Sequence, residues 1–315
     1  MMGIEPECDK QIGGGGGRGP FMYASGRFGY VYVALSAVLF AASGTAAKYL
    51  FLHGVTPYQL VQIRTAIASA FLLAWLAVTD RASLRIAPQD LPRFLLLGLV
   101  LAATMFAYFY AISRIPVAAA ILLQYQSPVL VAAYALLFSR ERHSVKTLAA
   151  VAGSCIGCYL AVGAYTLDLL SLNGAGIAGG LAAAAFLTAY TVLSESALRR
   201  HKPWTVLVYA SLFSAAACNL LVAPFEGLAR SYDAVQWFWV LFIGIAGTAV
   251  SLGLYNKGLR LIRATHASIT ATLQPIAAAA IAFFFLGEAM SPWQIAGVFL
   301  VVASITLLQL GKDNP

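Results

Sequence analysis

The chain alternates between long apolar stretches and short polar segments. Ten of these stretches have about the 17 to 25 residues that an α-helix needs to cross a bilayer. The pattern therefore predicts ten transmembrane helices, at residues 29–50, 56–78, 92–112, 116–138, 145–164, 174–198, 203–224, 235–256, 263–285 and 291–310.

Helix-start signals precede three of the stretches. Thr56 stands before Pro57, Ser291 stands before Pro292, and Asp90 lies two residues before Pro92. A hydroxyl or carboxylate side chain followed by proline in the first turn is typical of a helix N-terminus. We therefore expect Thr56, Asp90 and Ser291 to cap their helices.

Composition excludes a soluble protein. Hydrophobic residues make up 61% of the chain and charged residues 10%, whereas a soluble domain carries about 25% charged residues. So few charges cannot cover the water-facing surface of a chain of 315 residues. We predict an all-α integral membrane protein whose ten helices form two inverted five-helix repeats, for the reasons that follow.

The first 28 residues differ from the rest. An unbroken glycine run at 13–17 is flanked by polar and charged residues, which predicts a disordered tail over residues 1–28. The apolar stretch that follows is too long for the core of a signal peptide, so we expect a retained first helix. Translation starting at Met22 is one hypothesis for this segment.

The formal net charge of +8 is distributed in clusters between the apolar stretches. Cytoplasmic loops of membrane proteins carry an excess of Lys and Arg. With the N-terminus inside, 16 of the 20 Lys and Arg residues fall on the cytoplasmic side, and only Arg114 and Arg230 fall in outer loops. This predicts a multi-pass protein of a bacterial inner membrane with both termini cytoplasmic, and it argues against nucleic-acid binding.

The two halves of the chain share a register. At an offset of 147 residues, proline, tyrosine and glutamate recur at matched positions, as in Tyr108 with Tyr255, Pro128 with Pro275 and Glu141 with Glu288. Because each half has five spans, the second half enters the membrane from the opposite side. Residues 29–164 and 174–310 are therefore predicted to be inverted repeats, an arrangement common in secondary transporters.

Two stretches of the chain carry similar motifs. The first runs from Arg114 through Ile, Pro, Val and three Ala, with Gln–Ser–Pro at 126–128 and Glu141; the second runs over 259–297 with Gln274–Pro275 and Leu–Gly–Glu at 286–288. These stretches resemble the EamA repeats of the drug/metabolite transporter superfamily. Arg64 also matches an arginine usual in the family, whereas Arg140 stands where the family more often has glycine. The resemblance implies a ten-helix secondary transporter, often an exporter, for metabolites, amino acids or drugs.

Proline and polar residues interrupt two of the apolar stretches. Pro128 and Pro275 fall near the middle of the fourth and ninth predicted helices, where each frees a backbone carbonyl. They are candidate hinges beside a solute, and the alternative is a packing kink. Gln124 and Ser127 share a helical face with Pro128 and are candidate solute ligands; the alternative is hydrogen bonding between helices.

Arg64 is the most informative charged residue. It lies about 8 residues, or ~12 Å, from the outer end of its helix, where a charge is costly and needs a partner. It is a candidate ligand for an anionic group of the solute. The alternatives are structural bonds to helix-end carbonyls or a pair with Glu288 as an outer gate.

Tyrosines complete the candidate solute site. Some of the many aromatic residues must line any cavity, and Tyr108, Tyr190 and Tyr255 are the candidates retained. Together with Arg64, Gln124 and Ser127 they make up the predicted substrate-binding set.

Other functions find little support in the chain. No span has a carboxylate at its middle, so proton coupling through Glu195 or His266 is neither supported nor excluded. The sequence contains no phosphate-binding glycine loop with lysine and no nucleophile–base pair, and we expect no enzyme activity, cofactor or metal. The expected partners are a small-molecule solute and the bilayer, with a homodimer left open. The alternative function is a non-transporting membrane scaffold on a transporter fold.

Overall fold

The computed structural model describes residues 26–138, 144–167, 172–221, 226–286 and 291–310, and every regular element in them is a helix. The main helices are α1 (Gly26–Leu52), α2 (Pro57–Thr79), α3 (Leu91–Ile112), α4 (Val117–Gln124), α5 (Ser127–Leu137), α6 (Val145–Ala161), α7 (Gly174–Leu198), α8 (Pro203–Leu221), α10 (Ala234–Gly244), α11 (Ser251–Leu261), α12 (Ala264–Ala271), α13 (Leu273–Leu286) and α14 (Pro292–Leu310). Short turns complete them: η2 (Arg81–Leu84), η3 (Pro88–Asp90), η4 (Ala164–Thr166) and α9 (Glu226–Ala229).

Most predicted spans are present, with three corrections. The predicted fourth and ninth spans, 116–138 and 263–285, are each interrupted, giving α4–α5 and α12–α13. The eighth span does not end at Asn256, because α10 continues through a π-helical segment, η5 (Ile245–Val250), into α11. The predicted disordered tail reached residue 28, yet α1 begins at Gly26; Met22 and the glycine run lie outside the described residues.

Two of the three predicted caps are confirmed. The Thr56 hydroxyl accepts from the backbone N–H of Gln59, whose side chain bonds back to Thr56. Ser291 and Gln294 form the same reciprocal pair. Asp90 does not cap α3, because its carboxylate instead faces Arg93 and His201 at 3.5 and 3.3 Å.

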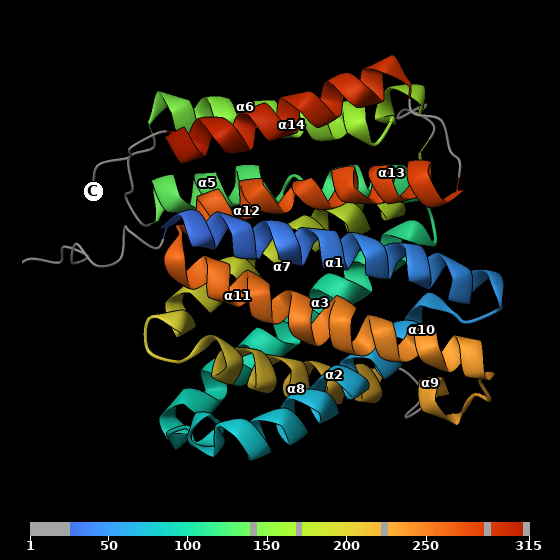
Figure 1. The fold of residues 1–315 in the computed structure, drawn as a ribbon, viewed down its shortest axis with the longest axis vertical. Coiled ribbons are helices and arrows are strands. Elements are labelled where there is room, and N and C mark those ends of the chain that lie inside the picture. Colours follow the sequence, from blue (N-terminus) through green and yellow to red (C-terminus); the bar gives the residue numbers. More distant parts are fainter. Residues whose placement is uncertain (1–25, 139–143, 168–171, 222–225, 287–290, 311–315) are drawn as a thin grey trace, which may run out of the picture.

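The packing of the helices follows the repeat. α3, in the third span of the first half, packs against α7, the first span of the second half. α1, the first span of the first half, likewise packs against α11, in the third span of the second half. Both pairs are among the most extensive contacts in the fold. The pairs α2–α8 and α6–α14 each join a span to its own counterpart, and they lie at opposite edges of the molecule, with the other helices between them (Figure 1). This arrangement is that of two halves related by a pseudo-two-fold axis.

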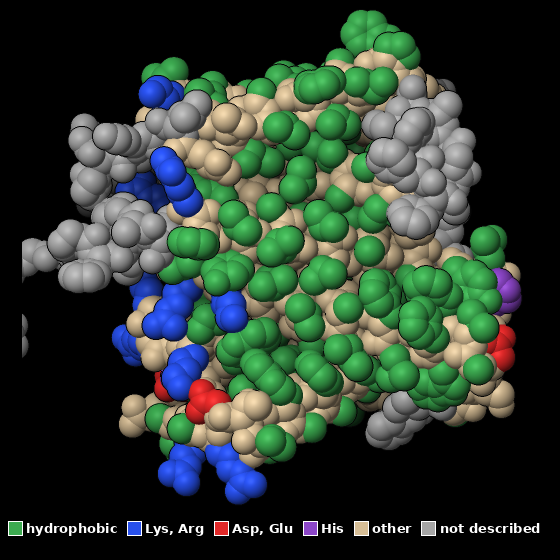
Figure 2. Space-filling model, viewed as in Figure 1, with side chains coloured by type: hydrophobic (Ala, Val, Ile, Leu, Met, Phe, Trp, Pro, Cys, Tyr) green, Lys and Arg blue, Asp and Glu red, His purple; other side chains and the backbone are tan. Residues whose placement is uncertain are grey.

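The outer surface suits a bilayer. Eight helical segments of the described chain are long and apolar enough to cross a membrane. The other two predicted spans are α6, with 17 residues, and α12–α13. Figure 2 shows apolar side chains over the middle of the molecule and Lys and Arg gathered at the left edge, where α1 begins and α14 ends. We call that edge the basic face; its loops carry Arg81, Arg85, Arg199, Arg200, Lys202 and Arg263.

The α2–α8 pair is held by polar contacts at the basic face. The Lys202 ammonium lies 2.7 Å from the Asp80 carboxylate, and the Tyr209 hydroxyl donates to the carbonyl of Leu84 at 2.6 Å. The ammonium of Lys202 and the hydroxyl of Ser83 lower the pKa of Asp80 below its usual value. These contacts tie the loop after α2 to α8.

A second set of contacts, at the opposite face, joins the start of α2 to α9 and to the residue that follows α9. The Gln59 amide donates to the Glu226 carboxylate at 2.9 Å, and the backbone N–H of Gly227 donates to the Gln62 side chain at 2.7 Å. The Arg230 guanidinium donates to the carbonyls of Gly54 and His53 at 2.6 and 3.0 Å. The short helix α9 is thereby fastened to the start of α2.

Candidate solute-binding site

Two helices break near the middle of the bilayer at positions related by the repeat. α4 ends at Gln124 and α5 begins at Ser127, with Pro128 in its first turn. α12 ends at Ala271 and α13 begins at Leu273, two residues before Pro275. Proline favours the first turn of a helix because its missing N–H has no partner there in any case. Each proline therefore lies just after a local break within its span, and Gln126 and Thr272 in the breaks keep near-helical backbone angles. The hinge role of the two prolines stays a prediction.

The two breaks are joined by a hydrogen bond. The Tyr125 hydroxyl donates to the Gln274 side-chain oxygen at 2.6 Å, and only 6% of Tyr125 is exposed. The side chain of Gln126 also caps its own break, since its amide donates to the carbonyl of Leu122 at 3.1 Å. Irregular backbone at membrane depth is tolerated where it is buried in protein or lines a cavity. The paired breaks therefore mark the polar centre of the molecule.

Three predicted tyrosines lie around this centre. Tyr108 of α3 and Tyr255 of α11 are within electrostatic range of the Tyr125 hydroxyl. The Tyr255 hydroxyl is 3.0 Å from that of Thr191, the residue after Tyr190 on α7. The predicted tyrosines thus come together from three helices, two of them in the second repeat.

Tyr190 belongs to a buried polar group that the sequence did not reveal. Its hydroxyl lies beside Ser194 and Asn256. Within the described part of the chain, however, none of their side-chain polar atoms has a partner at hydrogen-bonding geometry. Asn256 is 0% exposed. An unpaired buried amide or hydroxyl costs about 1–3 kcal/mol, so a polar partner that reached this group would be bound favourably.

The two predicted polar residues on the fourth span lie on either side of the break between α4 and α5. Gln124 is the last residue of α4 and is half-buried, whereas Ser127 is the first of α5 and is buried. The carbonyl of Ser127 accepts a 3.4 Å hydrogen bond from Thr188 of α7. Gln126, in the break between Gln124 and Ser127, keeps near-helical backbone angles, and the solute-binding role of these two residues stays a prediction.

Arg64 lies farther from the basic face. Its Nε donates to the Thr248 hydroxyl at 3.0 Å, and Thr248 donates to the carbonyl of Ile243 at 2.8 Å. Thr248 precedes Tyr255 by seven residues on one continuous helix, so Arg64 is about 10 Å from the level of Tyr255. Arg64 thus has a structural partner, and Glu288, its other suggested partner, lies outside the described residues.

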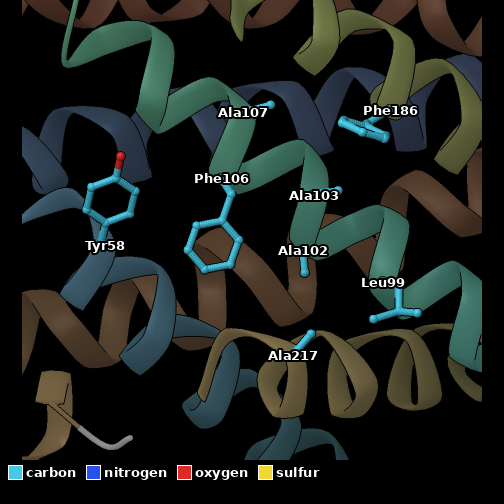
Figure 3. Close-up of a pocket in the computed structure, with 8 residues that line it drawn as sticks. All are labelled: Tyr58, Leu99, Ala102, Ala103, Phe106, Ala107, Phe186 and Ala217. Atoms are coloured by element: carbon cyan, nitrogen blue, oxygen red, sulfur yellow. The ribbon is translucent and has the colours of Figure 1, made fainter. Parts of the chain in front are cut away.

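Two cavities bear on the candidate site, and the larger of these does not suit a polar solute. It has a volume of about 590 Å³. In Figure 3, α3 contributes a row of lining side chains, flanked by Phe186 of α7 and Ala217 of α8. The walls are almost entirely apolar: Tyr58, Leu99, Ala102, Ala103, Phe106, Ala107, Phe186 and Ala217. Leu99 and Phe186 are exposed on the lipid-facing surface, so we do not assign this groove to the solute.

The smaller cavity is polar and lies toward the basic face. Its volume is about 270 Å³, and it is enclosed by α5, α7 and the start of α12. It begins one helical turn from Ser127 and Thr188, because Val131 and Val192 follow those residues by four positions. Its lining comprises Val131, Tyr134, Ala135, Val192, Glu195, Ser196, Arg199, Ala264 and Thr265.

Comparison with known proteins identifies the family. Residues 27–163 and 174–310 each match the EamA-like transporter family. The chain is a member of that family. The uncharacterized inner membrane transporter YicL of Salmonella typhimurium is 26% identical over 91% of this chain and 96% of its own.

An EamA relative with a named solute is also similar. The threonine/homoserine exporter RhtA of Salmonella typhimurium is 29% identical over 86% of this chain and 87% of its own. A crystal structure of a protein with 18% identity superposes with a TM-score of 0.75 over 90% of this chain and 96% of its own, which supports the fold alone. This EamA chain is therefore a multi-pass membrane transporter.

Proposed function

We propose that the chain is a secondary-active exporter of small metabolites such as amino acids, and that it works by alternating access between its two repeats. The observation that carries this proposal is the pair of interrupted helices joined by Tyr125 and Gln274. Discontinuous helices at the midplane form the solute sites of many transporters built from inverted repeats. RhtA, a relative that covers most of the chain, is named as an exporter.

In this mechanism the polar centre binds the solute. The hydroxyls of Tyr108, Tyr190 and Tyr255 supply hydrogen bonds from the walls, and Gln124 and Ser127 supply them from the break between α4 and α5. Arg64 attracts an anionic group of the solute from the side away from the basic face. Because the Tyr125–Gln274 bond crosses between the repeats, it forms and breaks as the halves rock.

The basic face is proposed to be cytoplasmic, with both termini inside a bacterial inner membrane. Both ends of the described chain lie at that face (Figure 1), and Lys and Arg concentrate there, as cytoplasmic loops require. A cysteine introduced at Arg200 should react with membrane-impermeant maleimide only after the membrane is opened, whereas one at Ser231 should react in intact cells. The reverse pattern would overturn the orientation.

Transport is tested with purified protein in liposomes preloaded with unlabelled amino acid. We expect uptake of labelled L-threonine or another small amino acid by exchange, above that of protein-free liposomes. Tyr255→Phe should reduce exchange about tenfold, because the bound solute loses a hydrogen bond from a buried hydroxyl. Tyr49→Phe is the matched control, since that ring packs against His53 at the opposite face.

Two outcomes contradict the proposal. If wild-type protein exchanges no amino acid or other metabolite, transport of this class is wrong. If exchange occurs but Tyr255→Phe and Gln124→Ala leave it unchanged, the solute site is wrongly placed. A non-transporting scaffold on a transporter fold would exchange no solute in liposomes. Its function in vivo would also survive Tyr255→Phe and Gln124→Ala.

The hinge role of the prolines has its own test. Pro275→Ala restores an N–H at the start of α13 and permits a continuous helix across Thr272. We expect a slower exchange rate with little change in half-saturating solute concentration, because the substitution alters the movement and not the ligands. A proportional loss of affinity would indicate that Pro275 shapes the site and does not act as a hinge.

A further inference from the structure

The polar cavity at the basic face carries one acid and one base on the same wall. Glu195 and Arg199 both line it, and they are four residues apart on α7. Side chains at this spacing lie one above the other on a helix. Arg199 is exposed near the end of α7, and Glu195 is half-buried one turn deeper. The cavity therefore presents a positive group at its mouth and a negative group below it.

Other residues that line the cavity add to this separation of charge. Ala264 and Thr265, which also line the cavity, are the first two residues of α12. The N-terminal end of a helix favours a negative group, so it adds to the attraction that Arg199 exerts. Val131, Ala135 and Val192 supply an apolar wall. A solute with one anionic group, one cationic group and a small side chain matches each of these surfaces.

The cavity also leads to the proposed solute site. Glu195 is one helical turn from Thr191, whose hydroxyl is hydrogen-bonded to that of Tyr255. Glu195 is also within electrostatic range of Tyr255. At about 270 Å³, the volume is below the 300–1,000 Å³ typical of sites for drug-sized ligands. It is therefore suited to a small metabolite entering toward Tyr255.

We propose that this cavity is a loading site for small zwitterionic α-amino acids, in which Glu195 receives the ammonium group and Arg199 the carboxylate. The inference rests on the proposed function and adds the charge pattern of its solute. Glu195 already interacts within the protein. Its two oxygens offer about four lone-pair sites, so it can accept an ammonium group without giving up that interaction.

The test measures binding to purified full-length protein by calorimetry with three probes. L-threonine carries both charges, L-threonine amide lacks the carboxylate, and 2,3-dihydroxybutanoate lacks the ammonium group. We expect wild type to bind L-threonine about tenfold or more tightly than either analogue, because each analogue leaves one charged partner unused.

The variants should separate the two charges. Glu195→Gln should weaken L-threonine binding about tenfold and leave 2,3-dihydroxybutanoate unchanged. Arg199→Gln should weaken L-threonine similarly and leave the amide unchanged. Arg200→Gln, an exposed neighbour, is the control. Each variant must retain its gel-filtration profile, and Glu195→Asp, which keeps the charge, should restore most of the binding that Glu195→Gln loses.

Failure of this inference is distinguishable from failure of the transport proposal. If wild type exchanges amino acids in liposomes but both variants bind all three probes as wild type does, the loading site is wrong while transport stands. A variant that weakens all three probes equally also overturns the charge assignment. If wild type neither binds nor exchanges any zwitterionic amino acid but exchanges another metabolite, the loading-site inference alone fails. If it exchanges no solute of any kind, both proposals fail together.

Discussion

The helix pairs α6–α14 and α2–α8 each join a span to its counterpart in the other repeat, but they are held together differently. α6 and α14 approach through their backbones: a Cβ atom on Gly157 would lie 2.6 Å from a Val301 methyl group and 2.9 Å from the carbonyl oxygen of Gly297. One hydroxyl contact, between Tyr165 and Ser291, ties their ends at the opposite face. α2 and α8 instead share a hydrogen bond between the Gln62 and Asn219 side chains, and polar and charged contacts join the segments next to their ends at both faces.

The difference follows from the solvent around each contact. Inside lipid, helices gain little from burying apolar surface against each other, so small residues that permit close packing hold them together. Charged contacts are costly at that depth and occur at the ends, near water. The α6–α14 pair should therefore respond to side-chain volume, and the α2–α8 pair to charge and pH.

The largest effect is expected from Gly157→Ala. The added methyl group meets Val301 and the backbone of α14, and overpacking of this kind costs about 1–3 kcal/mol. That loss should exceed the gain in helix propensity of up to about 1 kcal/mol. The apparent unfolding temperature in detergent should fall.

The control for that prediction is Gly44→Ala. Gly44 lies in α1, and a Cβ there would meet nothing within 4 Å. This variant should unfold at the wild-type temperature or above it, because only helix propensity changes. Equal behaviour of the two variants would mean that close packing at Gly157 does not hold α6 to α14.

A smaller effect is expected from Arg230→Gln at the opposite face. The substitution removes the guanidinium that donates to the carbonyls of His53 and Gly54, and the loss should be about 1 kcal/mol at this exposed position. Arg85→Gln, an exposed arginine on the basic face, should have no measurable effect. Comparable unfolding temperatures for the two variants would show that the α9 contacts contribute nothing to the α2–α8 pair.

The helices were largely predictable from sequence, whereas their interruptions were not. The predicted span 174–198 coincides with α7, because its apolar run is bounded by Asn173 and by two arginines. Pro128 and Pro275 were predicted as hinges within their spans, but a single sequence does not show how far a helix is interrupted before its proline. The eighth span was predicted at 235–256, yet α11 continues to Leu261.

The candidate site was predictable in residue type but not in pairing. Tyr108, Tyr190 and Tyr255 could be chosen as polar aromatic residues in apolar spans. The partners that define the site are far apart in sequence: Tyr125 bonds Gln274 across 149 residues and Arg64 bonds Thr248 across 184. A single sequence specifies which side chains are polar within a span, but the packing of the two halves decides which of them meet.

The smallest effect, and the one that most directly tests the role of charge, is that of pH on the Asp80–Lys202 contact. Because Lys202 and Ser83 lower the pKa of Asp80 in the folded protein, the ionised carboxylate is favoured by folding. Its stabilisation is therefore present above the unfolded pKa of about 3.9 and is lost as the pH falls through the lower folded value.

The unfolding temperature of Asp80→Asn should lie slightly below that of wild type at pH 7. This difference in unfolding temperature should disappear in acid and in high salt. Lys202→Gln should behave in the same way, and the double variant should be no less stable than either single one. Two outcomes would contradict the distinction between a pair held by charge and a pair held by close packing. The difference in unfolding temperature between Asp80→Asn and wild type could persist below both pKa values. Alternatively, the destabilisation of Gly157→Ala could show the same pH dependence.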